Sequence, residues 1–409
     1  MATPAVGENR SENTTSVIRQ IFAVSMREAT CADALSSVSF SPGQQGPIGG
    51  KFVNHTRDQH TIVRKPPRKS RRLVWDCIPF GFELDMLWLH LRTVNPVVDR
   101  FVISESSTTH NLESTKPLLL TALLANDTVP DNLASKMTLK VVDFRQGKVR
   151  YCSGGRFRGN PVRCFEAFQR FVLLETVLEL ASPGDLALFG DTDEIAKPDT
   201  VRMLAQCYPF DGDPAPFAPL YVFKLSLYHY GVHCRAGNSF KLGTRAFSVK
   251  SLNESYGRFR EASPAELGEM SVGFTRTREI LNGPTIPDAG WHFSGFGEPS
   301  ELQRKLTTWI HSNLFDPKRK GPETLDLARL ERCSRYCLEL GGILERGGKR
   351  QEARSPPPCA GRPVMEPDVA LPGQLLTSID SKSDLPTPLL TDRARYPASW
   401  FRYVRPIGV

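Results

Sequence analysis

Apolar residues follow strand and helix periods only in the middle of the chain, from about residue 73 to residue 347. Short apolar runs predict β-strands at 73–80, 100–105, 139–144 and 186–189. Between them, apolar residues at helical spacing predict amphipathic helices at 83–94 and 162–180. Strands that alternate with helices in this way are typical of a mainly parallel sheet covered by helices. We therefore expect an α/β fold.

The pattern changes after residue 206. Residues 221–230 alternate between apolar and polar side chains for much of their length, and residues 244–250 also predict a strand. Two amphipathic stretches, 300–312 and 324–344, predict helices that close the unit. We expect one domain with a mixed, mainly parallel sheet flanked by helices, spanning residues 73–347.

The two ends of the chain lack this periodicity. Residues 1–72 are rich in Ser, Thr, Gly and Pro, and residues 348–409 contain a Pro-rich stretch. This composition favours a disordered basic N-terminal segment and a mostly irregular C-terminal tail. The last dozen residues include several aromatic side chains, which we expect to pack back on the domain.

Composition limits the classes of function. Lys and Arg number 52 against 44 Asp and Glu, a net charge of +8, but residues 64–72 alone carry six positive charges and no negative one. The excess charge therefore does not predict a nucleic-acid-binding surface on the folded part. The chain has no apolar run of about 18 residues, which a transmembrane helix requires. Its nine cysteines form no CxxC pair, which argues against a zinc knuckle.

The clearest candidate site follows the predicted strand 186–189. Asp191, Asp193 and Glu194 come directly after it, at the end where ligands bind in open α/β sheets. Asp191 and Asp193 are spaced to offer carboxylate oxygens to one divalent cation, which would neutralise a diphosphate leaving group. The alternative is a solvated acidic turn that caps the next helix.

A second cluster lies at residues 288–297, where three glycines accompany aromatic side chains and a histidine. This composition suits a close backbone approach to a flat ligand. His292 is a candidate metal or phosphate ligand, Trp291 a candidate donor contact, and Asp288 a candidate general base. The alternative is a tight turn with a core tryptophan and a hydrogen-bonded histidine.

Further acidic and basic side chains surround the predicted strand ends. The carboxylates are candidates for holding ribose or sugar hydroxyls, although Glu83 would serve equally as an early-turn acid of the following helix. An arginine on the helix 162–180 is a candidate phosphate contact. The residues are Asp76, Glu83, Asp85, Glu105 and Arg170.

Several of these segments, in this order, resemble glycosyltransferase family 17. The similar stretches cover roughly residues 74–316; they are Asp76–Leu87, Asn95–Ser106, Lys116–Leu118, Phe168–Arg170, Asp191–Ile195 and Ala289–Ser294. Each motif alone is unspecific, but their occurrence together in this order is specific. Ala196 departs from the family pattern, which has a proline after Asp-Glu-Ile.

The resemblance implies a GT-A-like fold and an inverting transfer of N-acetylglucosamine from UDP-N-acetylglucosamine to a mannose of a glycoprotein N-glycan, with a β-1,4 linkage. It implies that Asp191 and Asp193 bind Mn²⁺ or Mg²⁺ together with the diphosphate. A general base must take the proton of the acceptor hydroxyl, and Asp288, Glu194 and Glu105 are the candidates. The resemblance also implies a Golgi or secretory location and membrane association, although no anchor precedes the domain in this chain.

Other functions stay open at this point. An acidic metal site also suits a phosphoester hydrolase, but only eight histidines occur, and none forms a ligand-spaced pair near Asp191. A non-enzymatic protein would use the basic residues 64–72 to bind nucleic acid or an anionic surface. A degenerate transferase acting as a lectin would be expected to lose the acidic motif, which is intact here.

Overall fold

The computed structural model describes residues 71–110, 115–144, 161–207, 221–235, 243–261, 285–308, 326–335 and 385–401. The strands in this part of the chain are β1 Val74–Phe80, β2 Arg100–Ser106, β3 Met137–Val142, β4 Leu186–Phe189, β5 Glu194–Ala196, β6 Tyr221–His229, β7 Arg245–Ser248 and β8 Thr285–Ser294. The main helices are α3 Leu84–Val94, α4 Leu119–Ala125, α5 Asp131–Ala134, α7 Pro161–Leu180, α8 Pro198–Cys207, α9 Val249–Glu261, α11 Pro299–Thr308, α13 Leu327–Arg335 and α15 Thr387–Thr391.

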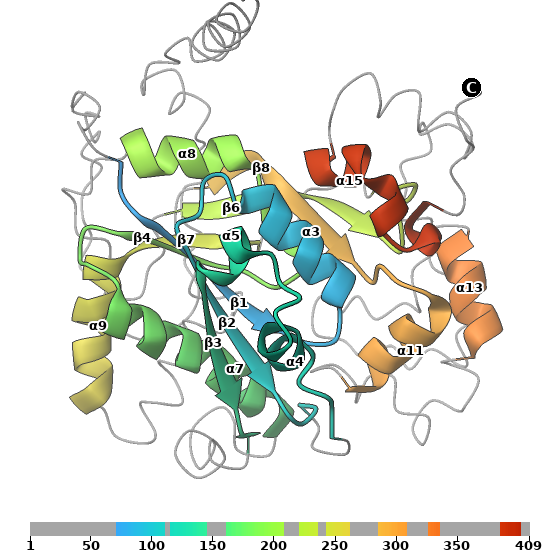
Figure 1. Cartoon of the computed structure of the whole chain (residues 1–409), viewed down its shortest axis with the longest axis horizontal. Helices are drawn as coiled ribbons and strands as arrows, with labels where there is room; N and C mark the ends of the chain where they lie inside the picture. Colours follow the sequence, from blue (N-terminus) through green and yellow to red (C-terminus); the bar gives the residue numbers. More distant parts are fainter. Residues whose placement is uncertain are drawn as a thin grey trace, which may run out of the picture.

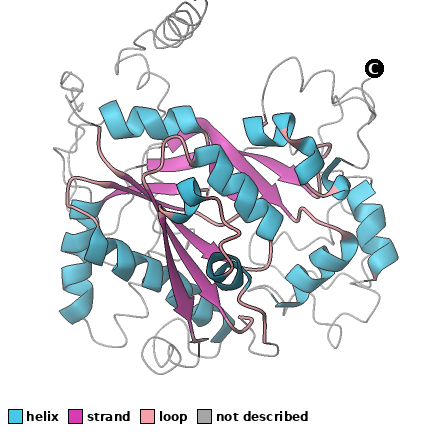
Figure 2. Cartoon of the chain, viewed as in Figure 1, coloured by secondary structure: helices cyan, strands magenta, loops and turns pink. Residues whose placement is uncertain are grey.

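All eight strands belong to one sheet with the order β3-β2-β1-β4-β7-β6-β8-β5. Among these pairs, β1 with β2, β1 with β4, β2 with β3, and β6 with β8 are parallel, whereas the other three pairs are antiparallel. Figure 2 shows the sheet as a single twisted layer with helices on both faces. The predicted mixed, mainly parallel sheet flanked by helices is confirmed.

Alternation along β1 explains why helices cover both faces. Val74 and Ile78 contribute to one core cluster together with α3 and α8, whereas Trp75 and Cys77 contribute to a second cluster with α7 and α9. Successive strand residues point to opposite faces, so a strand with apolar residues at nearly every position requires cover on both sides. Figure 1 shows this arrangement, with the sheet between the two sets of helices.

Several predicted elements need correction at their ends. The third strand begins at Met137 rather than at residue 139, and β7 ends at Ser248, because Val249 already begins α9. The first part of the glycine-containing stretch, residues 288–294, belongs to strand β8, and a turn begins only at Gly295. The predicted helices 300–312 and 324–344 continue beyond α11 and α13 into residues that lie outside the described ranges.

The two predicted tails lie largely outside the described residues. Arg71 and Arg72, however, belong to the described domain: Arg71 binds both carboxylate oxygens of Asp99 at 2.6 Å, and Arg72 donates to the carbonyl of Gly184. At the other end, residues 385–401 form α15 and two 3₁₀ helices, η4 Arg393–Arg395 and η5 Ala398–Phe401. Trp400 and Phe401 of η5 are buried in the core cluster that contains α3, as expected for the aromatic end of the chain.

Candidate functional site

The candidate site lies where the chain order of the sheet reverses. From the central strand β1 the chain passes to β2 on one side and later returns to β4 on the other, and β1 is parallel to both. The carboxyl ends of β1 and β4 therefore lie next to each other at one edge of the sheet. Ligands of open α/β sheets bind outside the carboxyl ends of the strands at such a reversal. The acidic turn 190–193 follows β4 directly.

Backbone and side-chain bonds hold this acidic turn against β1. The Thr192 hydroxyl donates to the carbonyl of Pro79 at 2.9 Å, and the amide of Asp191 donates to Glu194 at 3.2 Å. A side chain at Gly190 would come within 2.5 Å of the Thr244 hydroxyl oxygen, so the turn requires glycine there. The turn is thus a fixed part of the fold rather than a solvated loop.

The two aspartates of the turn contact different cations. Asp191 forms an ion pair with Arg170 of α7, which also binds Glu166 at 3.1 Å. Asp193 receives a hydrogen bond from Lys305 of α11 at 3.0 Å, and its other carboxylate oxygen lies 3.6 Å from Nε2 of His292. The acidic motif is therefore paired with cations from two different helices, α7 and α11.

Lys305 joins the acidic turn to the loop after β1. Its ammonium group lies 2.8 Å from Glu83 and 3.0 Å from Asp193, and all three side chains are at least 70% buried. Burial alone would raise the pKa values of both carboxyls, but the adjacent ammonium outweighs it and holds the pKa of Glu83 and that of Asp193 below their ordinary values. The two carboxylates correspondingly raise the pKa of Lys305. This cluster is ionised at neutral pH.

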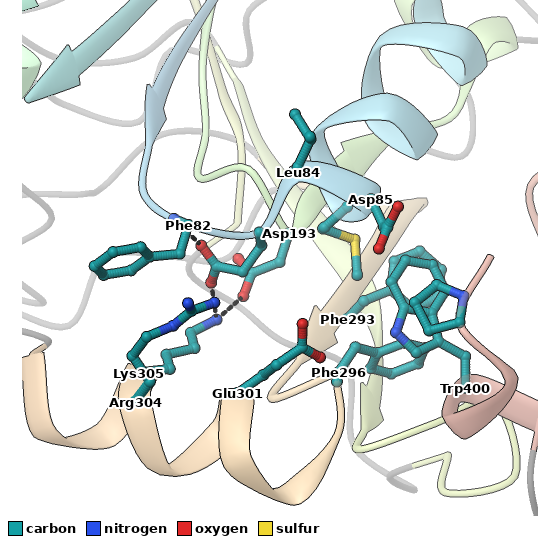
Figure 3. Close-up of a pocket in the computed structure, with 14 residues that line it drawn as sticks. Phe82, Leu84, Asp85, Asp193, Phe293, Phe296, Glu301, Arg304, Lys305 and Trp400 are labelled. Carbon is teal, nitrogen blue, oxygen red and sulfur yellow. Dashed lines mark hydrogen bonds and ion pairs between the residues drawn. The ribbon is translucent and has the colours of Figure 1, made fainter. Parts of the chain in front are cut away.

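The Lys305 cluster forms one side of a pocket of about 100 Å³, shown in Figure 3. Acidic and basic side chains gather at one end, where the guanidinium of Arg304 also stacks on the ring of Phe82 at 4.7 Å. The other end carries two further carboxylates and an aromatic wall. The lining residues there are Asp85, Glu301, Phe293, Phe296 and Trp400.

Two sequence comparisons bear on this site. Residues 54–233 match the model of glycosyltransferase family 17. The β-1,4-mannosyl-glycoprotein 4-β-N-acetylglucosaminyltransferase of Homo sapiens is 27% identical over 278 residues, which are 65% of this chain and 49% of that protein. The enzyme of the same name from Rattus norvegicus is also 27% identical and is covered to 48%. The chain thus spans about half the length of these curated relatives.

The chain resembles glycosyltransferase family 17. The predicted resemblance is confirmed, and the matches support the predicted class of enzyme, a glycosyltransferase. Among solved structures, an active-site mutant of LgtC covers 52% of this chain and is itself covered to 72%, with a TM-score of 0.27 and 11% identity. A superposition of that quality supports no assignment of fold family.

The family 17 match includes the acidic turn but ends before β8 and α11. Asp191 and Asp193 therefore lie inside the matched range, whereas His292 and Lys305 lie outside it. The fold brings His292 to Asp193 because β5 pairs with β8, with Glu194 opposite His292. Of the residues predicted to bind metal or donor, the structure places Glu83, Asp85, Asp193 and His292 in or beside the pocket.

The three candidate general bases lie away from this pocket. Glu105 is fully buried and accepts hydrogen bonds from the amides of Leu120 and Thr121 in the first turn of α4. Glu194 is also fully buried and accepts the amide of Asp191. Asp288 has a 65% exposed side chain, which forms a 2.6 Å ion pair with Lys197. None of these carboxylates lines the pocket that the structure describes.

Asp76 and Trp291 are packed inside the domain. The two ring nitrogens of His90 lie 3.0 Å from a carboxylate oxygen of Asp76 and 2.9 Å from the carbonyl of Thr192, two acceptors that favour the protonated ring. Burial opposes this charge, but Asp76 outweighs it and raises the pKa of His90 above its ordinary value. Trp291 is 5% exposed and belongs to the core cluster of α3 and α8. Both positions favour structural roles.

The glycines near His292 also have a structural explanation. A side chain on Gly290 would lie 2.2 Å from the carbonyl oxygen of Ile195, so glycine is needed for the close pairing of β5 with β8. Gly295 and Gly297 have φ angles of 67° and 142°, which favour glycine in the turn toward α11. The predicted close backbone approach is therefore found at Gly290, between β8 and β5.

Sequence reasoning missed Lys305, Arg304, Glu301 and Trp400 as pocket residues. The first three share the amphipathic helix α11, and Lys305 lies one turn of helix beyond Glu301, on the same face. That spacing would have predicted pocket residues only if the helix had been known to face the site. Trp400 is more than 300 residues distant from Glu83 in sequence, and no local pattern connects the two.

Within the described ranges, no group of three or more His, Cys, Asp or Glu side chains is arranged to hold a metal ion. In proteins, a nucleotide-bound Mg²⁺ usually needs only one or two carboxylates in addition to substrate phosphates. Asp193 and His292, with facing atoms 3.6 Å apart, bring an oxygen and a nitrogen donor close together. The residues present therefore fit a cation that is shared with a diphosphate.

Proposed function

We propose that this chain is an inverting glycosyltransferase that moves N-acetylglucosamine from UDP-N-acetylglucosamine to a mannose of a glycoprotein N-glycan, forming a β-1,4 linkage. The single observation that carries the proposal is the Lys305–Asp193–His292 cluster at the carboxyl ends of β1 and β4. The named relatives and the family 17 match support the choice of donor and acceptor.

The cluster suits a leaving diphosphate. Asp193 and His292 would hold a divalent cation, with Asp191 as a further donor once it is released from Arg170. The chemistry that such a cation supplies is charge neutralisation on the departing UDP. Lys305 and Arg304 add positive charge to the same end of the pocket, where charge develops as the bond to the sugar breaks.

Inversion in a single displacement also requires a carboxylate that takes the acceptor proton. The surroundings of Glu105, Glu194 and Asp288 favour structural roles for all three, so we place the base among the carboxylates that line the pocket. Of the four carboxylates that line it, Glu83 and Asp193 are already paired with Lys305, which leaves Asp85 and Glu301.

A secretory or Golgi lumen is the location that fits this activity. Cys164 and Cys234 each take part in a disulfide bond. Disulfides persist mainly in oxidising compartments. No helix in the described part of the chain is long and apolar enough to span a bilayer.

A donor screen tests the proposal. The full chain is incubated with UDP-N-acetylglucosamine, UDP-galactose, UDP-glucose or UDP-N-acetylgalactosamine, with and without Mn²⁺, and with a mannose-containing N-glycan as acceptor. We expect a new N-acetylglucosaminyl product that depends on Mn²⁺, and no comparable product from Asp193→Asn. Transfer of another sugar would refute the donor, and phosphoester hydrolysis without any transfer would favour the hydrolase.

A further inference from the structure

The pocket has two ends of different chemistry, as Figure 3 shows. Lys305, Arg304 and Asp193 gather at the charged end. At the opposite end, Asp85 and Glu301 stand beside the aromatic side chains of Phe293, Phe296 and Trp400. A pocket of about 100 Å³ is well below the size that encloses a drug-sized ligand, so each end takes only part of a substrate.

The aromatic end is assembled from segments that are far apart in sequence. Asp85 lies in the first turn of α3, Glu301 in the first turn of α11, and Trp400 in η5 near the end of the chain. The C-terminal segment is firmly attached. The amide of Val232 donates to the carbonyl of Trp400 at 3.1 Å, and Arg92 binds Asp392 at 2.9 Å.

Aromatic packing fixes the orientation of Trp400. Its ring stacks on that of Tyr396, with centroids 5.4 Å apart and an interplanar angle of 14°. The ring of Phe296 meets it edge-on, also at 5.4 Å. The indole is therefore held rigidly where it lines the pocket, although it comes from the segment 385–401.

Two polar groups at this end lack protein partners within the described residues. Trp400 is only 2% exposed, and its Nε1 is buried. This N–H has no hydrogen-bond acceptor among the described residues. The carboxylate of Asp85 is half-buried, and no donor or cation in the described part of the chain binds it. Buried N–H groups are almost always satisfied, so this indole N–H is available to an acceptor that a bound ligand supplies.

The ligand that matches these groups carries hydroxyls and an apolar face. A hydroxyl accepts from an N–H and donates to a carboxylate, and the C–H face of a hexose ring packs on an aromatic wall. A diphosphate does not fit here, because Asp85 and Glu301 would repel it. The end at Lys305 and Arg304 suits the diphosphate instead, because a cation shared with Asp193 and His292 would neutralise the phosphate charge there.

We propose that the end of the pocket formed by Asp85, Glu301 and Trp400 binds the acceptor hexose, and that Asp85 is the catalytic base. This inference rests on the proposed function. The hydroxyl O–H bond of the acceptor breaks, and its proton passes to the Asp85 carboxylate. The oxygen forms a bond to the anomeric carbon of the donor. The bond from that carbon to the diphosphate oxygen breaks, and its electron pair leaves with UDP.

The position of Asp85 suits this role. A nucleophile that inverts the anomeric centre approaches from the side opposite the leaving group, and Asp85 lies at the end of the pocket away from Lys305. Burial, together with the nearby charge of Glu301, raises the pKa of Asp85. A raised pKa brings a carboxylate base closer to the operating pH. The other charged groups that line the same pocket are Glu83, Asp193, Glu301, Arg304 and Lys305.

Three variants of the full chain test the inference with UDP-N-acetylglucosamine and a mannose-containing N-glycan. Asp85→Asn should lower transfer by about 10²–10⁴-fold, the usual contribution of a general base, while UDP affinity stays within twofold. Trp400→Phe keeps an aromatic ring but removes the N–H, and should raise the acceptor KM about tenfold without changing the donor KM. Ser399→Ala is the matched control, because Ser399 is also buried, is the neighbour of Trp400 in sequence and lies outside the pocket lining.

The outcomes separate this inference from the proposed function. If the wild-type chain transfers sugar but Asp85→Asn is as active, Asp85 is not the base. If Trp400→Phe weakens UDP-sugar binding instead of raising the acceptor KM, the aromatic end is a donor site and the inference is wrong. If the wild-type chain transfers no sugar, the proposed function fails, and binding of a mannose oligosaccharide is measured by NMR. Binding that Trp400→Phe loses and Ser399→Ala keeps supports the subsite; no binding overturns it.

Discussion

Replacing Lys305 with methionine should destabilise the domain strongly. The variant leaves Glu83 and Asp193 as neighbouring carboxylates without the ammonium that lies 2.8 Å and 3.0 Å from them. Their side chains are only 27% and 12% exposed, so water replaces the lost partner poorly. Removing one partner of a buried ion pair costs about 3–5 kcal/mol. We expect a loss of about 3 kcal/mol, because one carboxyl can take up a proton instead.

The pH dependence of this loss follows from the pKa shifts. In the wild type, Lys305 lowers the pKa values of Glu83 and Asp193, so their contribution to stability is present above the ordinary carboxyl range and is lost as pH falls through the lowered pKa values. In Lys305→Met the two carboxylates repel each other and their pKa values rise. The variant should therefore regain part of the lost stability when the pH is lowered from 7 to 5.

Urea unfolding of the full chain at pH 7 and pH 5 measures both effects. Lys305→Arg keeps the positive charge and should lose much less stability than Lys305→Met. Lys250→Met is a matched control, because Lys250 forms an exposed ion pair with Glu254 at 3.6 Å and such pairs contribute about 0–1 kcal/mol. Equal unfolding midpoints for Lys305→Met and Lys250→Met, or the same pH profile in Lys305→Met and the wild type, would refute the reasoning.

Three further predictions concern groups around the site. His292→Ala should weaken UDP binding in the presence of Mn²⁺ by about 1–3 kcal/mol in calorimetry, with little change in melting temperature, and unchanged affinity would exclude its role. Glu105→Gln should cost about 1–3 kcal/mol in urea unfolding, because a buried charge that caps α4 is lost, and a neutral result would contradict that role. Protonated His90 stabilises the fold through Asp76. This contribution is fully present below the ordinary pKa of histidine and is lost as the pH rises through the raised pKa of His90. Asp76→Asn should flatten that dependence in thermal melts, and an unaltered profile would argue against the ion pair.

The sequence predicts the first half of the sheet well because its patterns are local. The apolar run of β4 and the helical spacing in α3 each arise from neighbours in the chain, and the observed bounds lie within a few residues of the predicted ones. The acidic turn follows from β4 in the same way. Strand β8 was harder to predict from the sequence. Gly290 is needed for a close contact with Ile195, which is distant in sequence, and such a contact produces no local hydrophobic pattern.

The composition of the pocket depends on tertiary contacts that no local pattern contains. Lys305 and Trp400 reach the site only after β8 pairs with β5 and the C-terminal segment packs against α3. Glu105 shows the converse problem. A carboxylate at a strand end suggests chemistry, but here the N-terminal amides of α4 take up both of its oxygens. Only the position of α4 distinguishes a cap from a catalytic group.

The central claim is that the cluster around Asp193 binds a nucleoside diphosphate together with a divalent cation. Calorimetric titration of UDP with Mn²⁺ into the wild type, Asp193→Asn and Asp288→Asn tests it directly. Asp288 is the control, because its exposed carboxylate pairs with Lys197 outside the pocket. The account predicts saturable binding to the wild type and Asp288→Asn, and a loss of at least tenfold in affinity for Asp193→Asn. Undiminished binding by Asp193→Asn, or no binding by the folded wild type, would contradict it.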